Sequence, residues 1–256
     1  MSVTKGVFFD HATDGFAEVS GWVGSDDGLL VRDLNGNGTI DSGVELFGSE
    51  TLLSVGQKAA NGFEALRELD SNGDRIIDSS DTAFAGLRVW QDKNSDGYTS
   101  NGELLTLEEA GVKSININYI NSNYVDAQGN FHKQIGNFTT AEGLTRTAAD
   151  VWVQTNPAHS LPIEWIDVPQ DIAWLPDAKG YGKVRDLQQA MAMDSTGKLK
   201  ALVTAFTQAT EPEDRDALIT QILYRWTGVQ DIDPTSRASR IGFDPIDPDT
   251  FSRLGL

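Results

Sequence analysis

The chain has 256 residues, with 38 Asp and Glu against 20 Lys and Arg, so its formal net charge at pH 7 is -18. This excess of acid excludes a surface dedicated to nucleic acid, because phosphate contacts need clustered Lys and Arg, and it disfavours anionic membranes. The chain contains no cysteine and only 3 histidines. Disulfides, thiolate zinc sites and a cysteine nucleophile are therefore excluded, and the few histidines argue against a His-rich metal site.

Helices predicted in the first half of the chain are short. The first spans 60–69, where Asn61 can cap a segment whose apolar residues share one face. A second is predicted over 79–87. A third starts at Thr106, whose spacing to Glu109 is that of a capping box.

Strands are predicted after these helices. Apolar residues alternate with polar ones over 113–119, which indicates a half-buried strand. Residues 126–130 have the composition of a hairpin turn, and 151–153 would close a small antiparallel sheet. We therefore expect residues 1–154 to form one module.

The remaining sequence predicts a linker and a helical domain. Prolines cluster in 155–178, which favours a linker or an extended, packed arm. Capping residues and apolar stripes predict three helices within 179–256. No stretch has the length and apolar character of a membrane-spanning helix, and the first residues do not form a signal peptide. The predicted class is α+β, with EF-hand-like calcium loops, a small antiparallel sheet and a three-helix C-terminal region.

Residues 92–103, the third loop, are the best candidate for binding calcium. Calcium takes roughly six to eight oxygens, and an EF-hand loop supplies them from positions 1, 3, 5, 7, 9 and 12, with glycine at position 6. Gly97 holds position 6 here. The expected ligands are five side chains and the carbonyl of Tyr98: Asp92, Asn94, Asp96, Tyr98, Ser100 and Glu103.

Residues 70–81, the second loop, repeat this spacing with two departures. Arg75 replaces the glycine at position 6, and Asp81, which is shorter than Glu, closes the loop. Because the shorter side chain favours binding through one oxygen, we expect a weaker site. The expected ligands, with Ile76 contributing its carbonyl, are Asp70, Asn72, Asp74, Ile76, Asp78 and Asp81.

Residues 33–45, the first loop, contain one residue more than this pattern. Glu45 falls at position 13, so the extra residue must be accommodated after Asp41, for example at Gly43. The candidate ligands are Asp33, Asn35, Asn37, Thr39, Asp41 and Glu45.

A fourth, irregular set of acids lies near the start of the chain, with Asp10 and Asp14 as ligands and Asp26 or Asp27 closing the site. Solvated turn acids are an equally good interpretation of this set. Asn, Asp and Gly favour turns in any case, so a single loop would be weak evidence. Three spaced loops favour calcium, and zinc fits poorly because the candidate ligands are all hard oxygens.

Several segments resemble the calcium-dependent self-processing module of FrpC-like iron-regulated RTX proteins. The likeness covers roughly Lys5 to Val153 and is carried by Gly21–Gly38, Glu45–Gly48, Glu68–Asp74 and Leu87–Asp92. Residues 175–228 are similar to a helical domain that accompanies haemolysin-type calcium-binding regions in very large secreted bacterial proteins.

The resemblance implies a module that folds on meeting calcium outside the cell, after type I secretion, and that stays extracellular or at the bacterial surface. A host-surface molecule or another protein is its candidate partner. In some members the resemblance also implies autocatalytic cleavage of an upstream Asp-Pro bond, in which the Asp carboxylate attacks its own carbonyl and a Lys amine captures the anhydride. This chain has no Asp-Pro ahead of the module; we expect the segment that would carry one to precede Met1. It also has no Gly-Gly-x-Gly-x-Asp repeats. Its Asp-Pro pairs at 233–234, 244–245 and 247–248 are explained by turn formation.

Two other classes of function compete with calcium binding. An adhesin would use exposed Trp22, Trp165 or Trp174 as stacking platforms, although buried aromatic anchors are the commoner use of such residues. A hydrolase is disfavoured, because the sequence has no Gly-x-Ser-x-Gly, His-Glu-x-x-His or P-loop pattern. We expect no catalysis by the chain alone and no membrane insertion.

Overall fold

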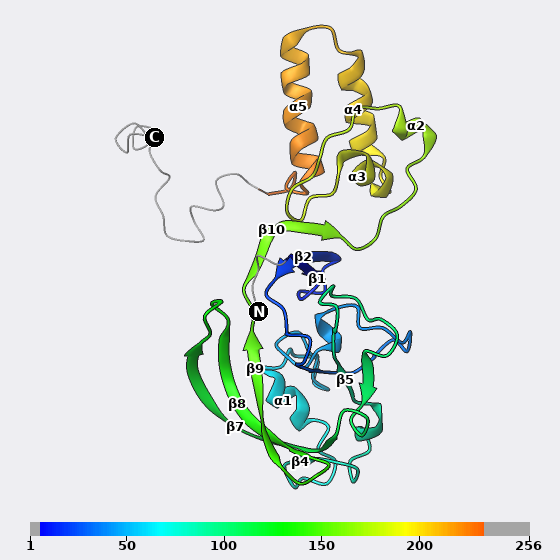
Figure 1. The fold of residues 1–256 in the computed structure, drawn as a ribbon. Helices are drawn as coiled ribbons and strands as arrows, with labels where there is room; N and C mark the ends of the chain where they lie inside the picture. Colours follow the sequence, from blue (N-terminus) through cyan, green and yellow to red (C-terminus); the bar gives the residue numbers. More distant parts are fainter. Residues whose placement is uncertain (1–5, 233–256) are drawn as a thin grey trace, which may run out of the picture. The chain divides into compact units, whose positions relative to one another are not determined.

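The computed structural model describes residues 6–232 and divides them into two compact units. The first unit comprises residues 6–165 and 181–183, and the second comprises 166–180 and 184–232. Strands dominate the first unit and helices the second (Figure 1). The Asp-Pro pairs at 233–234, 244–245 and 247–248 lie outside the described residues.

The predicted fold class is wrong, because the described chain is mostly β, with three antiparallel sheets. The EF-hand-like element is absent from the described residues, since an EF-hand has a helix on each side of its loop and no loop here does. Between the loops only one short α-helix forms, Gly62–Arg67, because the first turns of a helix are costly and the remaining segments pair as strands or make 3-10 turns. The second unit holds four α-helices instead of three.

The first sheet joins the start of the first unit to its end. Its order is β1 (Val7–Phe9), β2 (Phe16–Ser20) and β10 (Thr155–Pro162), so β10 is an outer strand. β10 contains Pro157 and Pro162, and its register on β2 shifts between Asn156 and Ser160.

Two paired strands of the second sheet are connected by the third loop. The order of this sheet is β3 (Leu29–Val31), β5 (Arg88–Trp90) and β6 (Leu104–Thr106), and β5 pairs directly with β6. The third loop therefore connects two paired strands, which fixes both of its ends.

The third sheet is the largest. Its order is β4 (Ile76–Ile77), β7 (Val112–Val125), β8 (Phe131–Thr140) and β9 (Thr145–Trp152), and the long strands curve around α1 (Figure 1).

Helix α1 (Gly62–Arg67) packs closely on this sheet through Phe63. The Phe63 ring lies 5.3 Å from that of Tyr119, centroid to centroid. A Cβ at Gly136 would come within 2.6 Å of the Phe63 ring, so only glycine leaves room for this contact.

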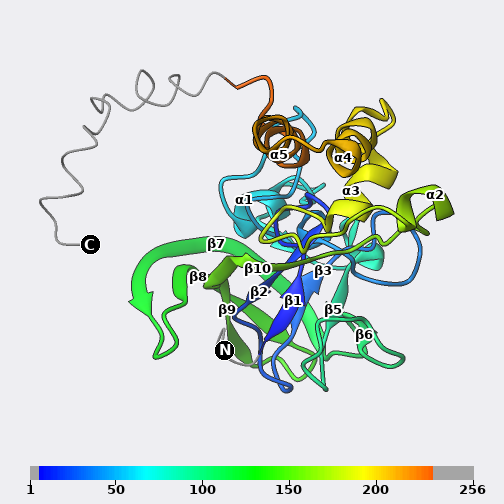
Figure 2. The same ribbon diagram turned by 90° about the horizontal axis from the view of Figure 1, so that it is seen from above.

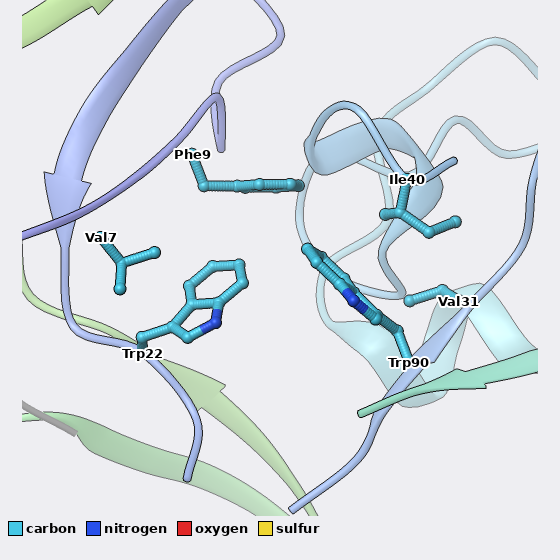
Figure 3. Close-up of a cluster of buried hydrophobic side chains, with 6 residues drawn as sticks. All are labelled: Val7, Phe9, Trp22, Val31, Ile40 and Trp90. Atoms are coloured by element: carbon cyan, nitrogen blue, oxygen red, sulfur yellow. The ribbon is translucent and has the colours of Figure 1, made fainter. Parts of the chain in front are cut away.

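Two buried clusters lie in the first unit. One contains Val7, Phe9, Trp22, Val31, Ile40 and Trp90 (Figure 3). The other contains Leu66, Ile77, Leu87, Leu107, Ile115 and Ile117. Ile40 and Ile77 both stand at position 8 of a predicted loop, so each of these loops is anchored in a core.

The second unit has its own core. Its helices are α2 (Gln170–Ala173), α3 (Leu187–Met193), α4 (Lys198–Gln208) and α5 (Pro212–Trp226), with α4 and α5 side by side (Figures 1 and 2). Their buried residues are Ile172, Leu187, Met191, Leu199, Val203 and Ile222. Within residues 6–232, none of the helices combines the length and apolar character that crossing a bilayer requires.

Local sequence signals have mixed outcomes. The Asn61 cap is confirmed, because its side chain accepts a hydrogen bond from Glu64 N at 2.9 Å. The hairpin turn at 126–130 is confirmed by its hydrogen bonds between β7 and β8. The helix predicted over 79–87 is wrong: only the 3-10 turn η3 (Phe84–Gly86) forms there.

The capping box at Thr106 forms its hydrogen bonds, yet no helix follows it. Glu109 N donates to Thr106 Oγ1 at 3.1 Å, and Glu109 Oε2 accepts from Thr106 N at 2.8 Å. β6 ends at Thr106 and β7 begins at Val112, so the segment between them has room only for turns.

The buried packing of His11 makes the stability of the first unit depend on pH. The His11 ring contacts the rings of Phe9 and Trp22 and hydrogen-bonds Ser20 Oγ. Burial lowers its pKa from 6.5 to about 4. The unfolded chain therefore binds a proton at His11 that the folded chain does not, over this pH interval.

Above about pH 6.5, His11 is neutral in the folded and the unfolded chain, so we expect it to have no effect on the free energy of unfolding. This free energy should fall as the pH drops toward about 4, by at most about 1.4 kcal/mol per pH unit from this residue. Denaturant unfolding with metals chelated, at about pH 7, 6 and 5, measures the slope. His11→Gln should remove this part of the slope, while His132→Gln should keep it; an unchanged slope in His11→Gln would contradict the assignment.

Candidate metal-binding loops

The three predicted loops lie at different places in the first unit. The first loop runs from the end of β3 to the 3-10 turn η2 (Gly43–Glu45). The second follows α1, contains β4 and ends before η3, and the third connects β5 to β6. Despite these different flanks, the closing acid of each loop makes the same two hydrogen bonds to backbone N–H groups.

The closing carboxylate of the third loop bridges its two ends. Glu103 Oε1 accepts from Lys93 N at 3.0 Å, and its Oε2 accepts from Ser100 N at 2.8 Å. These donors are positions 2 and 9 of the loop. Glu103 is 4% exposed, so the bridge is largely shielded from water.

Asp81 makes the same bridge in the second loop. Its Oδ1 accepts from Ser71 N at 2.7 Å and its Oδ2 from Asp78 N at 3.0 Å. Desolvation raises its pKa, but the hydrogen bonds from Asp78 and Ser71 prevail and hold the pKa of Asp81 below its usual value. The shorter side chain thus still reaches both ends of the loop.

Glu45 does the same in the first loop, although it stands at position 13. It accepts from Leu34 N at 3.1 Å and from Asp41 N at 2.7 Å, again positions 2 and 9. The turn η2 absorbs the additional residue. A Cβ at Gly43 would lie 2.0 Å from the carbonyl oxygen of His11, so this position is restricted to glycine.

The aspartate at position 1 of each loop accepts two backbone N–H groups. Asp33 binds Gly36 N and Gly38 N, at 2.7 and 2.9 Å. Asp70 binds the N–H groups of positions 4 and 6 in the second loop, at 2.8 and 2.9 Å. Asp92 binds those of positions 5 and 6 in the third loop, at 3.2 and 2.8 Å.

Positive φ angles at positions 4 and 6 make these turns. Arg75 has φ 66° where the first and third loops have Gly38 (82°) and Gly97 (77°). The glycine replacement in the second loop therefore leaves the backbone path intact, at the cost of strain that glycine avoids.

Oxygen atoms at alternate positions complete each loop. Position 3 accepts from the N–H of position 5, as Asn35 does from Asn37 N at 2.9 Å. Position 5 accepts from the N–H of position 7, as Asp96 does from Tyr98 N at 2.8 Å. An oxygen that accepts one such bond retains a second lone pair, whereas Asn37 Oδ1 also accepts from Thr39 Oγ1.

Side chains within the loops also hydrogen-bond one another. Asp41 accepts from the side chains of Asn37, Thr39 and Asn35. Desolvation works against them, but these hydrogen bonds hold the pKa of Asp41 below its usual value. Asn94 donates to Asp96 in the same way, at 2.8 Å.

The third loop is tied to the core and to the first loop. Asp92 is fully buried, and its Oδ2 accepts from Trp22 Nε1 at 2.5 Å. Ile40 N donates to Thr99 Oγ1 at 2.9 Å, which joins position 8 of the first loop to position 8 of the third.

The fourth predicted set is brought together only in part. Asp10 and Asp14 belong to one loop, whereas Asp27 accepts from Gly24 N and closes a separate turn. Glu18 and Lys183 join the first two acids and were missed by sequence reasoning. Regular spacing from Asp10 would have pointed to Glu18, but no signal in the sequence indicates Lys183.

The tryptophans proposed as stacking platforms differ in exposure. Trp22 is 5% exposed and belongs to the core, which excludes it as a platform. Trp165 and Trp174 are exposed.

The chemistry of the donors fits a hard cation such as calcium. Side-chain carboxylates and amides stand at alternate positions of each loop, hydroxyls are added by Thr39 and Ser100 in the first and third, and a buried acid closes all three. Among residues 6–232, no group of three or more His, Asp or Glu side chains gathers as a ready-made metal cluster. The expected ligand sets also include Asn side chains and backbone carbonyls, which such a grouping does not count.

Comparisons with known proteins identify relatives of this chain. The SPM domain family matches residues 1–154. The iron-regulated protein FrpA of Neisseria meningitidis serogroup C is 42% identical over 221 residues. This alignment covers 86% of the chain but 20% of that relative, so the chain spans about a fifth of its length.

The hydrogen bond from Trp22 to Asp92 should contribute measurably to stability. Trp22→Phe removes a donor from a buried carboxylate, and leaving such a group short of a partner costs about 1–3 kcal/mol. Trp90→Phe is the matched control, because Trp90 is also fully buried but its Nε1 has no hydrogen-bond partner. We expect Trp22→Phe to lower the free energy of unfolding in chelator by more than Trp90→Phe does. Equal losses in denaturant titrations would show that only packing matters at Trp22.

Proposed function

This chain belongs to the SPM domain family, and on that premise we propose that it is a calcium-binding module that folds around the ion. The module would be part of a longer, secreted bacterial protein. The relative named as iron-regulated and the segments resembling RTX proteins support the second part of the proposal. The hydrogen-bond geometry of the three loops supports the first part, calcium binding.

One observation carries the proposal: in three loops with different flanks, the closing carboxylate makes the same pair of hydrogen bonds to backbone N–H groups. The closing acids bridge positions 2 and 9 in every case. Ordinary Asx turns need only local bonds, from one residue to the next but one. A shared bridge over the whole loop supports a shared occupant.

Calcium is the occupant that this donor set favours. It accepts several oxygen ligands in flexible geometry, whereas zinc prefers nitrogen and sulfur, and magnesium keeps several waters. In the third loop the ion would be held by Asp92, Asn94, Asp96, the Tyr98 carbonyl, Ser100 and Glu103. When bound, calcium supplies positive charge that offsets the crowding of these acids.

Folding around calcium suits a secreted protein. Without the ion, like charges gather in each loop and weaken the first unit. Binding to the folded state alone would stabilise it by about RT ln(1 + [L]/Kd), near 2.7 kcal/mol for each site at a hundredfold excess over Kd. Low cytosolic calcium would then leave the module loose for export, and millimolar extracellular calcium would fold it.

The sequence resemblance favours a second candidate function, calcium-dependent cleavage of an Asp-Pro bond upstream of the module. Residues 6–232 contain no Asp-Pro pair, so cleavage requires a bond supplied from outside them. Adding the natural upstream segment and then calcium tests this function. A new pair of fragments on a denaturing gel supports it, and an intact chain at saturating calcium opposes it.

Glu103 should be decisive for calcium affinity in the third loop. Glu103→Gln keeps the size of the side chain but removes its charge and its two-oxygen grip, so affinity at this site should fall at least about tenfold, or roughly 1.4 kcal/mol. Calorimetric titration of calcium measures the change. Glu108→Gln is the control, because Glu108 is exposed and lies on the nearby turn. An unchanged isotherm for Glu103→Gln would refute the assignment.

Calcium should order the first unit and leave the second unchanged. The first unit carries all three loops, whereas the second has its own core and helices. Hydrogen exchange with calcium and with chelator should show protection gained mainly between Asp10 and Val153. Equal protection of these residues in chelator would reduce calcium to a passive surface ion.

A further inference from the structure

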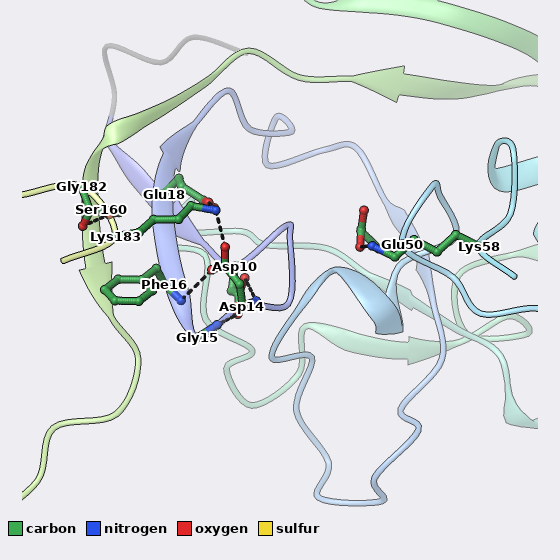
Figure 4. Close-up of polar contacts among 10 residues, drawn as sticks. All are labelled: Asp10, Asp14, Gly15, Phe16, Glu18, Glu50, Lys58, Ser160, Gly182 and Lys183. Carbon is green, nitrogen blue, oxygen red and sulfur yellow. Dashed lines mark hydrogen bonds and ion pairs between the residues drawn. The ribbon is translucent and has the colours of Figure 1, made fainter. Parts of the chain in front are cut away.

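The amino-terminal acids form a fourth loop, Asp10–Glu18, whose hydrogen bonds resemble those of the third loop (Figure 4). Asp10 accepts from Asp14 N at 3.1 Å and from Gly15 N at 2.9 Å. Asp14 Oδ1 accepts from Phe16 N at 3.2 Å. We call these residues the amino-terminal loop.

Each of these bonds has a counterpart in the third loop. Asp92 accepts from Asp96 N at 3.2 Å and from Gly97 N at 2.8 Å, and Asp96 Oδ1 accepts from Tyr98 N. Positions 4 and 6 have positive φ in both loops. The angles are 55° and 85° at Thr13 and Gly15, and 57° and 77° at Ser95 and Gly97.

The ligand set of the amino-terminal loop is nevertheless incomplete. Position 3 is Ala12 and position 12 is Gly21, so neither offers a side-chain oxygen. Three carboxylates remain, those of Asp10, Asp14 and Glu18. They are fewer than the oxygens that the other loops present to an ion.

An ammonium group lies among the remaining acids. Lys183 Nζ contacts Asp14 Oδ2 and lies 3.2 Å from Glu18 Oε1 (Figure 4). Glu18 is 4% exposed, and its Oε2 is buried without a hydrogen-bond partner. A buried carboxylate in this position needs a positive charge beside it.

Lys183 reaches the loop from a short segment that belongs to the first unit. Residues 181–183 group with this unit, while residues on both sides of them belong to the second. Ser160 Oγ in β10 donates to Gly182 O at 2.7 Å, which holds the segment next to β10.

We propose that Lys183 is the built-in cation of the amino-terminal loop. Its ammonium stands where the other loops would take an ion, so this loop closes without metal and fastens residues 181–183 to the first unit. An ammonium suits the reduced site, because it carries one charge and three donors and needs only a few acceptors. The inference concerns a loop outside the proposed calcium sites.

Counting bound calcium on the full chain tests the proposal. Lys183→Met vacates the loop, and we expect this variant to bind one calcium ion more than the wild type in equilibrium dialysis at millimolar calcium. Lys179→Met is the matched control, since Lys179 pairs with Asp186 in the second unit. It should bind the same number of ions as the wild type.

Asp14→Asn tests the proposal while Lys183 and its pairing with Glu18 are kept. We expect this variant to bind as many ions as the wild type, and to abolish the additional ion when combined with Lys183→Met. A loss of one ion on Asp14→Asn alone, or no additional ion in a folded Lys183→Met chain, would overturn the proposal. If Lys183→Met does not fold, the Asp14→Asn result decides alone. Both comparisons are differences, so they hold whatever number of ions the other three loops bind.

Discussion

The bridge from a buried carboxylate to the two ends of its own loop is the interaction on which the first unit depends. Glu45, Asp81 and Glu103 are almost fully buried, and each would be costly there without donors. Two backbone N–H groups meet each of them. Because those donors lie at both ends of a loop, satisfying the carboxylate also fixes the loop's shape. The short strands and turns on either side can then pair in register.

The loops are coupled to the hydrophobic core as well as to themselves. Ile40 and Ile77, the eighth residues of the first and second loops, are buried in the core. The Asp92 carboxylate accepts a hydrogen bond from Trp22, which belongs to the aromatic cluster. A change of charge at Asp92 therefore acts directly on the packing of the core. The bond between Ile40 and Thr99 extends this link from the third loop to the first.

The turn-forming Asx and Gly pattern of the loops was accessible to sequence reasoning, because its spacing is local and each position has a chemical reason; calcium binding by these loops stays a prediction. Sequence reasoning also found the Asn61 cap and the turn at 126–130, for the same reason. It failed where neighbours distant in the chain decide the outcome. The Thr106 capping box forms, but strand pairing on both sides limits it to turns. The pairing of Glu18 with Lys183 joins residues from opposite ends of the first unit, and no local pattern encodes it.

The two prolines of β10 limit how the first sheet can grow. An outer strand offers its free N–H and C=O groups to any extended segment that meets it, which is the usual route to edge-to-edge aggregation. Pro157 and Pro162 have no N–H, and the irregular register between Asn156 and Ser160 bends the strand. A foreign strand could therefore not complete a regular ladder along β10. Protection of this kind matters most while many copies of a chain are still incompletely folded at high local concentration.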